Sequence, residues 1–179
     1  PLRRTGLLAA PILFTNTSSV GAVYDGALGY MLAADPDLFA LPWSPEPVVG
    51  ETWADFLNDT AGGHVQAAHA VEAINNAIGG PVPEGSVGGG TGMRSYSFKA
   101  GIGTSSRRVE CGDRTYMVGV LVQANHGRRH QLVVDGVPVG RLIPELTPER
   151  GQKTKSLLIA LATDAPLLPV QLRRLCKRT

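Results

Sequence analysis

The sequence predicts an α+β fold in which sheet packs on sheet and helices lie outside the sheets. Two stretches near the start of the chain, 20–34 and 65–78, carry apolar residues at helical spacing. Extended segments then follow one another from Met93 to Thr163, and a final helix with basic residues follows them. Because 43% of the residues are hydrophobic and only 18% are charged, we treat 1–179 as a single folded domain.

The first elements can be assigned in order. Residues 11–16 predict a short buried strand, and the Thr-Ser-Ser run at 17–19 supplies N-cap chemistry for the helix over 20–34. The stretch 36–50 is rich in proline and predicts a loop. The second helix, over 65–78, shows the stripe of one buried face and ends before a Gly-Gly-Pro sequence.

The middle of the chain changes to the strand period. The strands that this pattern predicts cover 93–103, 107–111, 116–124 and 131–134. Asp135 and Gly136 then predict a turn. The segment 156–163, SLLIALAT, is an almost continuous apolar run and predicts a strand that is buried on both faces, and a last helix is predicted from Pro166 onward.

Composition and spacing exclude several classes of function. The net charge is only +2 and the basic residues are not interleaved with aromatic ones, so we expect no nucleic-acid partner. No apolar run is long enough to cross a bilayer, so we expect no membrane partner. Cys111 and Cys176 have no Cys or His at ligand spacing, and His64 and His69 stand at i, i+5, so we expect no metal and no cofactor.

A glycine-rich segment, 84–92, is the first candidate for chemistry. It is not a phosphate-binding P-loop, because Met93 and Arg94 follow the last glycine where a Lys-Ser or Lys-Thr pair is required. Two interpretations stay open: the glycines let the backbone approach another strand, or they line a substrate cleft.

Ser156 and Asn125 are the second and third candidates. The polar stretch 148–155 runs directly into the apolar strand that begins with Ser156, which is the arrangement that a self-cleaving nucleophile requires. Asn125 ends the apolar strand VGVLVQAN; it either caps a turn or donates its amide hydrogens to an oxyanion.

Taken in order, seven segments resemble one family over nearly the whole chain. They are ILFTNTSSVGAVYDG, VVGETWADFLND, GGPVPEGSVGGGTGM, FKAGIGTSSR, VGVLVQANHG, DGVPVG and SLLIALATDAPLLPVQLRRL. The family is that of the DmpA-type L-aminopeptidases/D-esterases and β-aminopeptidases, which are self-cleaving N-terminal-nucleophile hydrolases. The combination of GGGTGM, VLVQAN and ATDAPLLP makes the resemblance specific.

The resemblance implies a four-layer α/β/β/α sandwich of the DmpA and ornithine acetyltransferase type, incomplete in this chain. It further implies a precursor that cuts itself between Lys155 and Ser156. Residues 1–155 would then form an α-subunit-like part, and 156–179 the start of a β-subunit-like part.

The resemblance also implies roles for individual residues. Ser156 matches the nucleophile, and Asn125 matches an oxyanion donor. Glu51 matches an acidic residue that receives the free amine of the substrate, and Trp53 stands where the family implies a Tyr, so that a hydroxyl is absent there. The cleft-lining glycines would be Gly88, Gly89 and Gly90.

The implied activity is that of an autoprocessed serine aminopeptidase or amidase acting on small peptides, amides or esters. The expected assembly is a homo-oligomer of αβ units, and the expected compartment is the cytoplasm. Two departures set this chain apart: it ends at Thr179, before a supporting Ser and Glu of the family, and Lys155 occupies a position where a small residue or Asn is expected. The chain therefore resembles an internal fragment.

Two alternative functions stay open on the sequence. Acyl transfer of the ornithine acetyltransferase type would use a related self-cleaving fold, and Glu51 in its Glu-Thr-Trp context favours the aminopeptidase over it. A non-catalytic protein or fragment that keeps the fold without the chemistry is favoured by Lys155 and by the missing Ser and Glu. A cut between Lys155 and Ser156 would separate these hypotheses.

Overall fold

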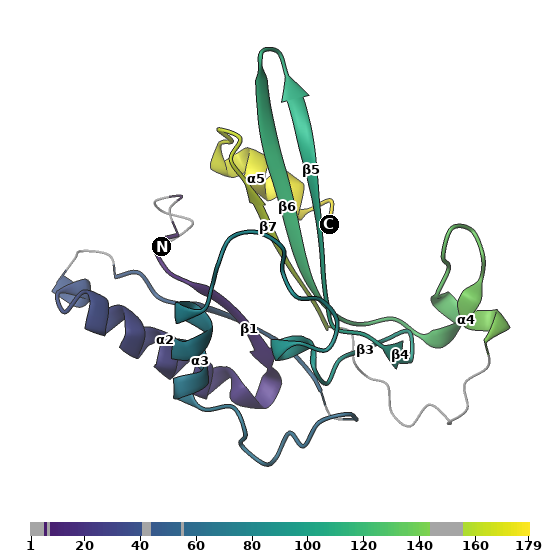
Figure 1. Ribbon diagram of the computed structural model, residues 1–179, viewed down its shortest axis with the longest axis horizontal. Helices are drawn as coiled ribbons and strands as arrows, with labels where there is room; N and C mark the ends of the chain where they lie inside the picture. Colours follow the sequence, from purple (N-terminus) through teal and green to yellow (C-terminus); the bar gives the residue numbers. More distant parts are fainter. Residues whose placement is uncertain (1–5, 7, 41–43, 55, 144–155) are drawn as a thin grey trace. The chain divides into compact units, whose positions relative to one another are not determined.

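A computed structural model of the chain describes residues 6, 8–40, 44–54, 56–143 and 156–179 (Figure 1). Its chain divides into two compact units, 1–81 and 82–179. Both mix helix and strand, as the sequence predicts.

The first unit is built on a β-α-β arrangement. Strand β1 (Ile12–Asn16) leads through helix α2 (Val20–Ala34) to strand β2 (Val48–Thr52), which pairs in parallel with β1. Helix α3 (Ala67–Asn75) packs on α2. At their contact, Gly26 comes so close to Ala67 that a Cβ on it would lie 2.2 Å from the Ala67 carbonyl oxygen.

The buried face of α2 holds this unit together. The buried apolar residues of the first unit are Val23, Ala27, Met31, Leu38, Ala54 and Ala70. The first three stand at i, i+4, i+8 on α2, so they form one apolar stripe of the predicted helix. Short 3-10 turns flank the helix at Thr17–Ser19 and Leu38–Ala40.

The second unit is built on an antiparallel sheet with the strand order β5–β6–β7 (Figure 1). Its strands are β5 (Ile102–Cys111), β6 (Arg114–Asn125) and β7 (Ser156–Thr163). Ahead of the sheet come the 3-10 turn Gly88–Gly90 and the small hairpin of β3 (Arg94–Ser95) and β4 (Phe98–Lys99). The remaining elements are a 3-10 turn (Arg129–Gln131), helix α4 (Val139–Leu142) and helix α5 (Pro169–Cys176).

Several predicted elements are confirmed with small shifts. The strand over 156–163 has the predicted bounds, and the turn at Asp135 and Gly136 closes with paired backbone hydrogen bonds between Val134 and Val137. Both turn residues have positive φ, 49° and 79°, as a two-residue turn of this kind requires.

Other predicted elements are wrong. The loop predicted over 36–50 ends in strand β2, because parallel pairing with β1 overrides the local signal. The single strand predicted over 93–103 is the β3–β4 hairpin followed by β5, since the chain turns at Tyr96 and Ser97. The strand predicted over 131–134 is a 3-10 turn followed by extended backbone with a single bridge.

Two finer expectations also need correction. The Thr-Ser-Ser run does not cap α2 directly: Asn16 accepts from the backbone N–H of Ser18, at 3.0 Å, and caps a 3-10 turn that leads into the helix. Strand β7 is half-exposed instead of buried on both faces, with Leu157 40% exposed, because among the described strands it pairs only with β6.

Candidate active site

The predicted nucleophile and the predicted oxyanion donor lie opposite each other at the ends of two paired strands. Asn125 is the last residue of β6 and Ser156 is the first of β7, and the antiparallel register pairs them. The Asn125 Nδ2 donates a hydrogen bond to Ser156 Oγ at 3.1 Å. Asn125 is only 2% exposed, so this amide is a buried donor with a fixed direction.

The direction of the Asn125 amide is fixed from its other side. Its Oδ1 accepts the backbone N–H of Arg94 at 3.2 Å. A backbone N–H can only meet an oxygen, so the NH₂ group must face Ser156. Between the two interpretations of Asn125, the hydrogen bond to Ser156 favours the oxyanion donor over the turn cap.

The glycine segment is pinned to the start of β5. Gly85 exchanges two backbone hydrogen bonds with Ile102, at 2.7 and 2.9 Å, and the carboxylate of Glu84 accepts from the N–H and hydroxyl of Thr104. These hydrogen bonds stabilise the charged carboxylate, so they lower the pKa of Glu84 below its usual value.

Close backbone approach accounts for one of the three predicted cleft glycines. Gly90 is buried, and a Cβ on it would lie 2.7 Å from both the Gly85 carbonyl oxygen and the Ile102 nitrogen. Gly88 has a φ of 49°, which glycine adopts without strain, and Gly89 completes the same turn. Backbone packing therefore explains Gly90.

A lysine holds the end of this turn. Lys99 Nζ donates to the carbonyl oxygens of Gly90, at 3.2 Å, and Ala100. Partial burial of the ammonium group lowers the pKa of Lys99 from its ordinary value. The side chain thus ties strand β4 to the glycine turn.

Replacing Gly101 with alanine should lower the melting temperature of the full-length protein by about 2–12 °C. A Cβ at Gly101 would lie 1.9 Å from the carbonyl oxygen of Gly85, which is backbone and cannot rotate away. Overpacking of this kind costs roughly 1–3 kcal/mol, and each kcal/mol shifts Tm by about 2–4 °C in a domain of roughly 150–250 residues. Gly103→Ala is the matched control, because nothing lies within 4 Å of its Cβ position. Equal melting temperatures of the two variants would contradict the packing role.

Glu51 lies in the first unit, in the next-to-last residue pair of the parallel strands β1 and β2. It is paired with Thr15 in the parallel register, and the hydroxyl of Thr17 donates to its Oε2. Trp53 follows one residue beyond β2 and is 41% exposed. Both strands end at this edge, so the carboxylate lies beside the 3-10 turn that begins α2.

Sequence reasoning missed three residues that contact the predicted ones. They are Thr17, which holds Glu51; Arg94, whose backbone orients Asn125; and Tyr96, which lies beside the residue after Asn125. A side-chain pattern gives no signal for a backbone donor, and the sequence pattern around Thr17 predicts a helix cap instead of a contact with Glu51. Lys155 lies outside the described residues.

The described part of the chain holds neither a cluster of metal-ligating residues nor a helix that could span a membrane. No group of three or more His, Cys, Asp or Glu residues there could hold a metal ion. His64 instead contacts Asp59, with 2.9 Å between Nε2 and Oδ2, and this hydrogen bond lowers the pKa of the Asp59 carboxyl group. Within the described ranges, no helix is long and apolar enough to cross a membrane.

Solved structures match the chain closely in fold. The L-aminopeptidase D-Ala-esterase/amidase of Ochrobactrum anthropi, described as a prototype for the serine aminopeptidases and a new variant among the Ntn hydrolase fold, matches with a TM-score of 0.82 and 43% identity, over 92% of this chain and 45% of that one. A β-aminopeptidase of Burkholderia sp. matches with a TM-score of 0.85 and 45% identity, over 97% of this chain and 47% of that one. The predicted α+β fold of the DmpA type is thereby confirmed.

Sequence comparison gives the family. A family model described as Peptidase family S58 matches residues 1–179, and the chain belongs to this family, as the resemblance predicts. The β-peptidyl aminopeptidase BapA of Sphingosinicella xenopeptidilytica is 45% identical over 185 residues, which cover 97% of this chain and 46% of the relative. BapA of Sphingosinicella microcystinivorans is 45% identical over 99% of this chain and 47% of its own length. The chain thus spans about half the length of the curated relatives it matches.

Proposed function

We propose that this chain carries the nucleophile and an oxyanion donor of an autoprocessed serine aminopeptidase or amidase. The observation that carries the proposal is the contact between Asn125 Nδ2 and Ser156 Oγ, 3.1 Å long, at the paired ends of β6 and β7. Membership of peptidase family S58 and the aminopeptidase names of the relatives support the same chemistry.

The first reaction is self-cleavage between Lys155 and Ser156. Ser156 Oγ attacks the carbonyl carbon of Lys155, the C–N bond breaks, and the Ser156 nitrogen leaves as a free amine while an ester forms. Water then hydrolyses the ester, releasing the Lys155 carboxylate and regenerating the hydroxyl. Ser156 becomes the first residue of a new chain.

The second reaction is hydrolysis of the substrate. An α-amino group has a pKa of about 7.7–8.0, so the amine of Ser156 can take the proton of its own hydroxyl near neutral pH. Oγ attacks the substrate carbonyl, and Asn125 donates to the oxygen on which negative charge develops. The protonated amine gives its proton to the leaving group, and water hydrolyses the acyl-enzyme.

Glu51 is proposed to bind the free terminal ammonium of the substrate. Thr17 supports this role, because its donated hydrogen bond holds one carboxylate oxygen and orients the carboxylate. The substrates would be small peptides, amides or esters with a free amine, and Trp53 would contribute apolar surface at the end of the same strand pair. The active assembly is proposed to be a homo-oligomer of αβ units in the cytoplasm.

Glu51→Gln in the full-length protein should lower kcat/KM for an aminoacyl p-nitroanilide by about 10–100-fold. Hydrogen bonds to charged groups contribute roughly 1.5–3 kcal/mol, and the amide has lost the charge that attracts an ammonium. The N-acetylated form of the same p-nitroanilide has no terminal ammonium. The preference of the enzyme for the free-amine substrate over this acetylated one should fall by the same factor in Glu51→Gln. Glu72→Gln, at an exposed position of α3, is the matched control.

The same measurement tests the proposed function as a whole. Wild-type protein that hydrolyses neither substrate after self-cleavage would refute the aminopeptidase. Unchanged selectivity in Glu51→Gln, beside an active wild type, would refute only the role of Glu51.

A further inference from the structure

The hairpin of β3 and β4 supplies the group that orients the Asn125 amide. The N–H of Arg94, which donates to Asn125 Oδ1, belongs to the first residue of β3. Arg94 pairs with Lys99, and Ser95 pairs with Phe98. The position of the Arg94 N–H therefore depends on the conformation of this short hairpin.

The turn of the hairpin is in a conformation that its residues do not favour. Tyr96 and Ser97 form the turn, and their φ angles are 53° and 61°. Turns of this kind normally contain Asn, Asp or Gly, because a Cβ disfavours the left-handed region. Two successive non-glycine residues in this region persist only where the surrounding structure holds them.

Contacts with the chain just after Asn125 hold this turn. The N–H of Tyr96 donates to the carbonyl oxygen of His126 at 2.8 Å, and the N–H of His126 donates to Ser95 Oγ at 3.2 Å. The rings of Tyr96 and His126 meet edge to face, with centroids 5.2 Å apart and planes at 64°. Hairpin and strand end are thus joined through backbone and ring.

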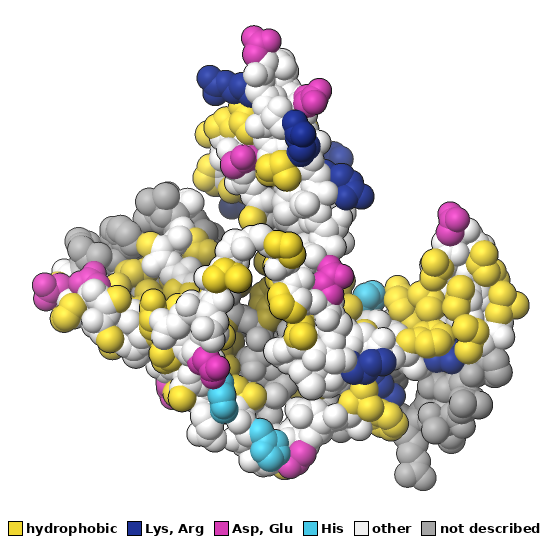
Figure 2. Space-filling view, viewed as in Figure 1, with side chains coloured by type: hydrophobic (Ala, Val, Ile, Leu, Met, Phe, Trp, Pro, Cys, Tyr) yellow, Lys and Arg dark blue, Asp and Glu magenta, His cyan; other side chains and the backbone are white. Residues whose placement is uncertain are grey.

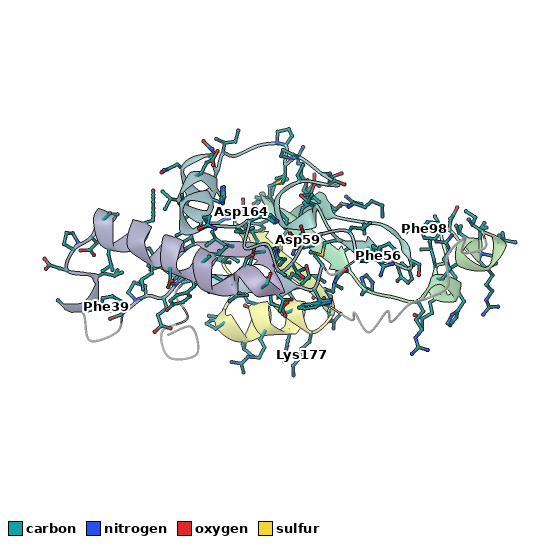
Figure 3. All side chains as sticks on the ribbon, turned by 90° about the horizontal axis from the view of Figure 1, so that it is seen from below. Phe39, Phe56, Asp59, Phe98, Asp164 and Lys177 are labelled. Carbon is teal, nitrogen blue, oxygen red and sulfur yellow. The ribbon has the colours of Figure 1, made fainter. Side chains whose placement is uncertain are left out.

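A second set of contacts holds the other half of the turn. Arg129 donates from a terminal guanidinium nitrogen to the Ser97 carbonyl oxygen at 3.1 Å, and its guanidinium lies 3.6 Å from the centre of the Phe98 ring. Figure 3 labels Phe98 and draws its side chain. Both halves of the turn are therefore fixed by residues that follow Asn125 in sequence.

Gly127 leaves the space that the Tyr96 ring occupies. A Cβ on Gly127 would lie 2.4 Å from two ring carbons of Tyr96, and the φ of Gly127 is 84°. The ring therefore packs against the backbone two residues beyond Asn125. Its hydroxyl contributes less, because 3.4 Å from His126 Nε2 is long for an O–H donor.

We propose that Tyr96 is a positioning residue for Asn125. Its ring, packed on His126 and Gly127, keeps the β3–β4 hairpin in its strained turn, and the hairpin in turn holds the Arg94 N–H on Asn125 Oδ1. The amide of Asn125 is then held in the one orientation in which its NH₂ faces the oxyanion. This inference rests on the oxyanion role of Asn125 proposed above.

The test is a double-mutant cycle in the full-length protein, with kcat expressed per self-cleaved chain. Tyr96→Ala should lower kcat about tenfold and leave KM within about twofold, since a misdirected amide weakens only transition-state binding. Tyr96→Phe keeps the ring and should recover most of this loss. In an Asn125→Ala background, Tyr96→Ala should cost less than about twofold, because it acts through a side chain that is no longer there.

Other kinetic results would refute either the positioning role of Tyr96 or the oxyanion role of Asn125. A further tenfold loss in the Asn125→Ala background would show that Tyr96 acts independently of Asn125 and would refute the positioning role. Wild-type kcat in Tyr96→Ala beside a slow Asn125→Ala would refute it too, and would leave the proposed function standing. Wild-type kcat in Asn125→Ala would refute the oxyanion role itself.

A second pair of variants keeps the test decisive if Tyr96→Ala does not fold. Gly127→Ala pushes a methyl group into the Tyr96 ring and should also lower kcat with little change in KM. Gly136→Ala is the matched control, because its φ of 79° brings the same backbone strain and its Cβ would meet open space. Equal kcat in the two alanine variants would refute the role of the ring.

Discussion

Replacing Ser156 with alanine should leave the full-length protein as a single uncut chain without aminopeptidase activity. The variant removes only Oγ, which is the proposed attacking atom in both reactions, so no slower route through the same side chain is expected. Mass spectrometry of the purified protein measures the cut, and wild-type protein should give a new chain that begins at Ser156. A p-nitroanilide assay measures the second reaction.

The control separates chemistry from folding. Ser106→Ala removes a hydroxyl from an exposed position on β5, in the same sheet, and should leave cleavage and activity intact. Asn125 keeps its pairing with position 156 through the backbone register, so we expect Ser156→Ala to fold. If Ser156→Ala protein were still cut at the Lys155–Ser156 bond, self-processing by this residue would be wrong.

Part of the fold and of the site could be predicted from the sequence because the signals are local. Strand 156–163 is an almost continuous apolar run, and helix α2 carries the buried stripe of Val23, Ala27 and Met31, so each element is specified by its own residues. The sequence predicts Ser156 and Asn125 separately, as the first and last residues of two apolar strands. The antiparallel register of β6 and β7 then makes them neighbours.

The missed parts depend on contacts far along the chain. Strand β2 needs β1 as its partner, and the turn at Tyr96 and Ser97 contains neither Gly nor Asn and is held by His126 and Arg129, about 30 residues away. No window of the sequence contains both sides of such a contact. Figure 2 shows exposed apolar side chains of the second unit around α4. The local sequence pattern there does not indicate that these side chains are exposed.

Replacing Asn125 with alanine should lower kcat by about 10²-fold or more. Removal of one oxyanion donor costs roughly 3–4 kcal/mol of transition-state stabilisation where the donor is fixed and shielded from water. Asn125 meets both conditions, because it is 2% exposed and Arg94 fixes its amide from the far side. The ground-state carbonyl gains less from the donor than the oxyanion does, so KM should change little.

Self-cleavage of Asn125→Ala should slow as well, since the same donor would face the carbonyl oxygen of Lys155 in the first reaction. The two rates are measured separately, cleavage by mass spectrometry over time and kcat per cleaved chain by steady-state assay. Asn76→Ala, at the exposed end of α3, controls for loss of an amide without loss of an oxyanion donor. A rise in KM with unchanged kcat would place Asn125 in substrate binding and remove it from the oxyanion role, because a donor that acts only in the transition state must appear in kcat.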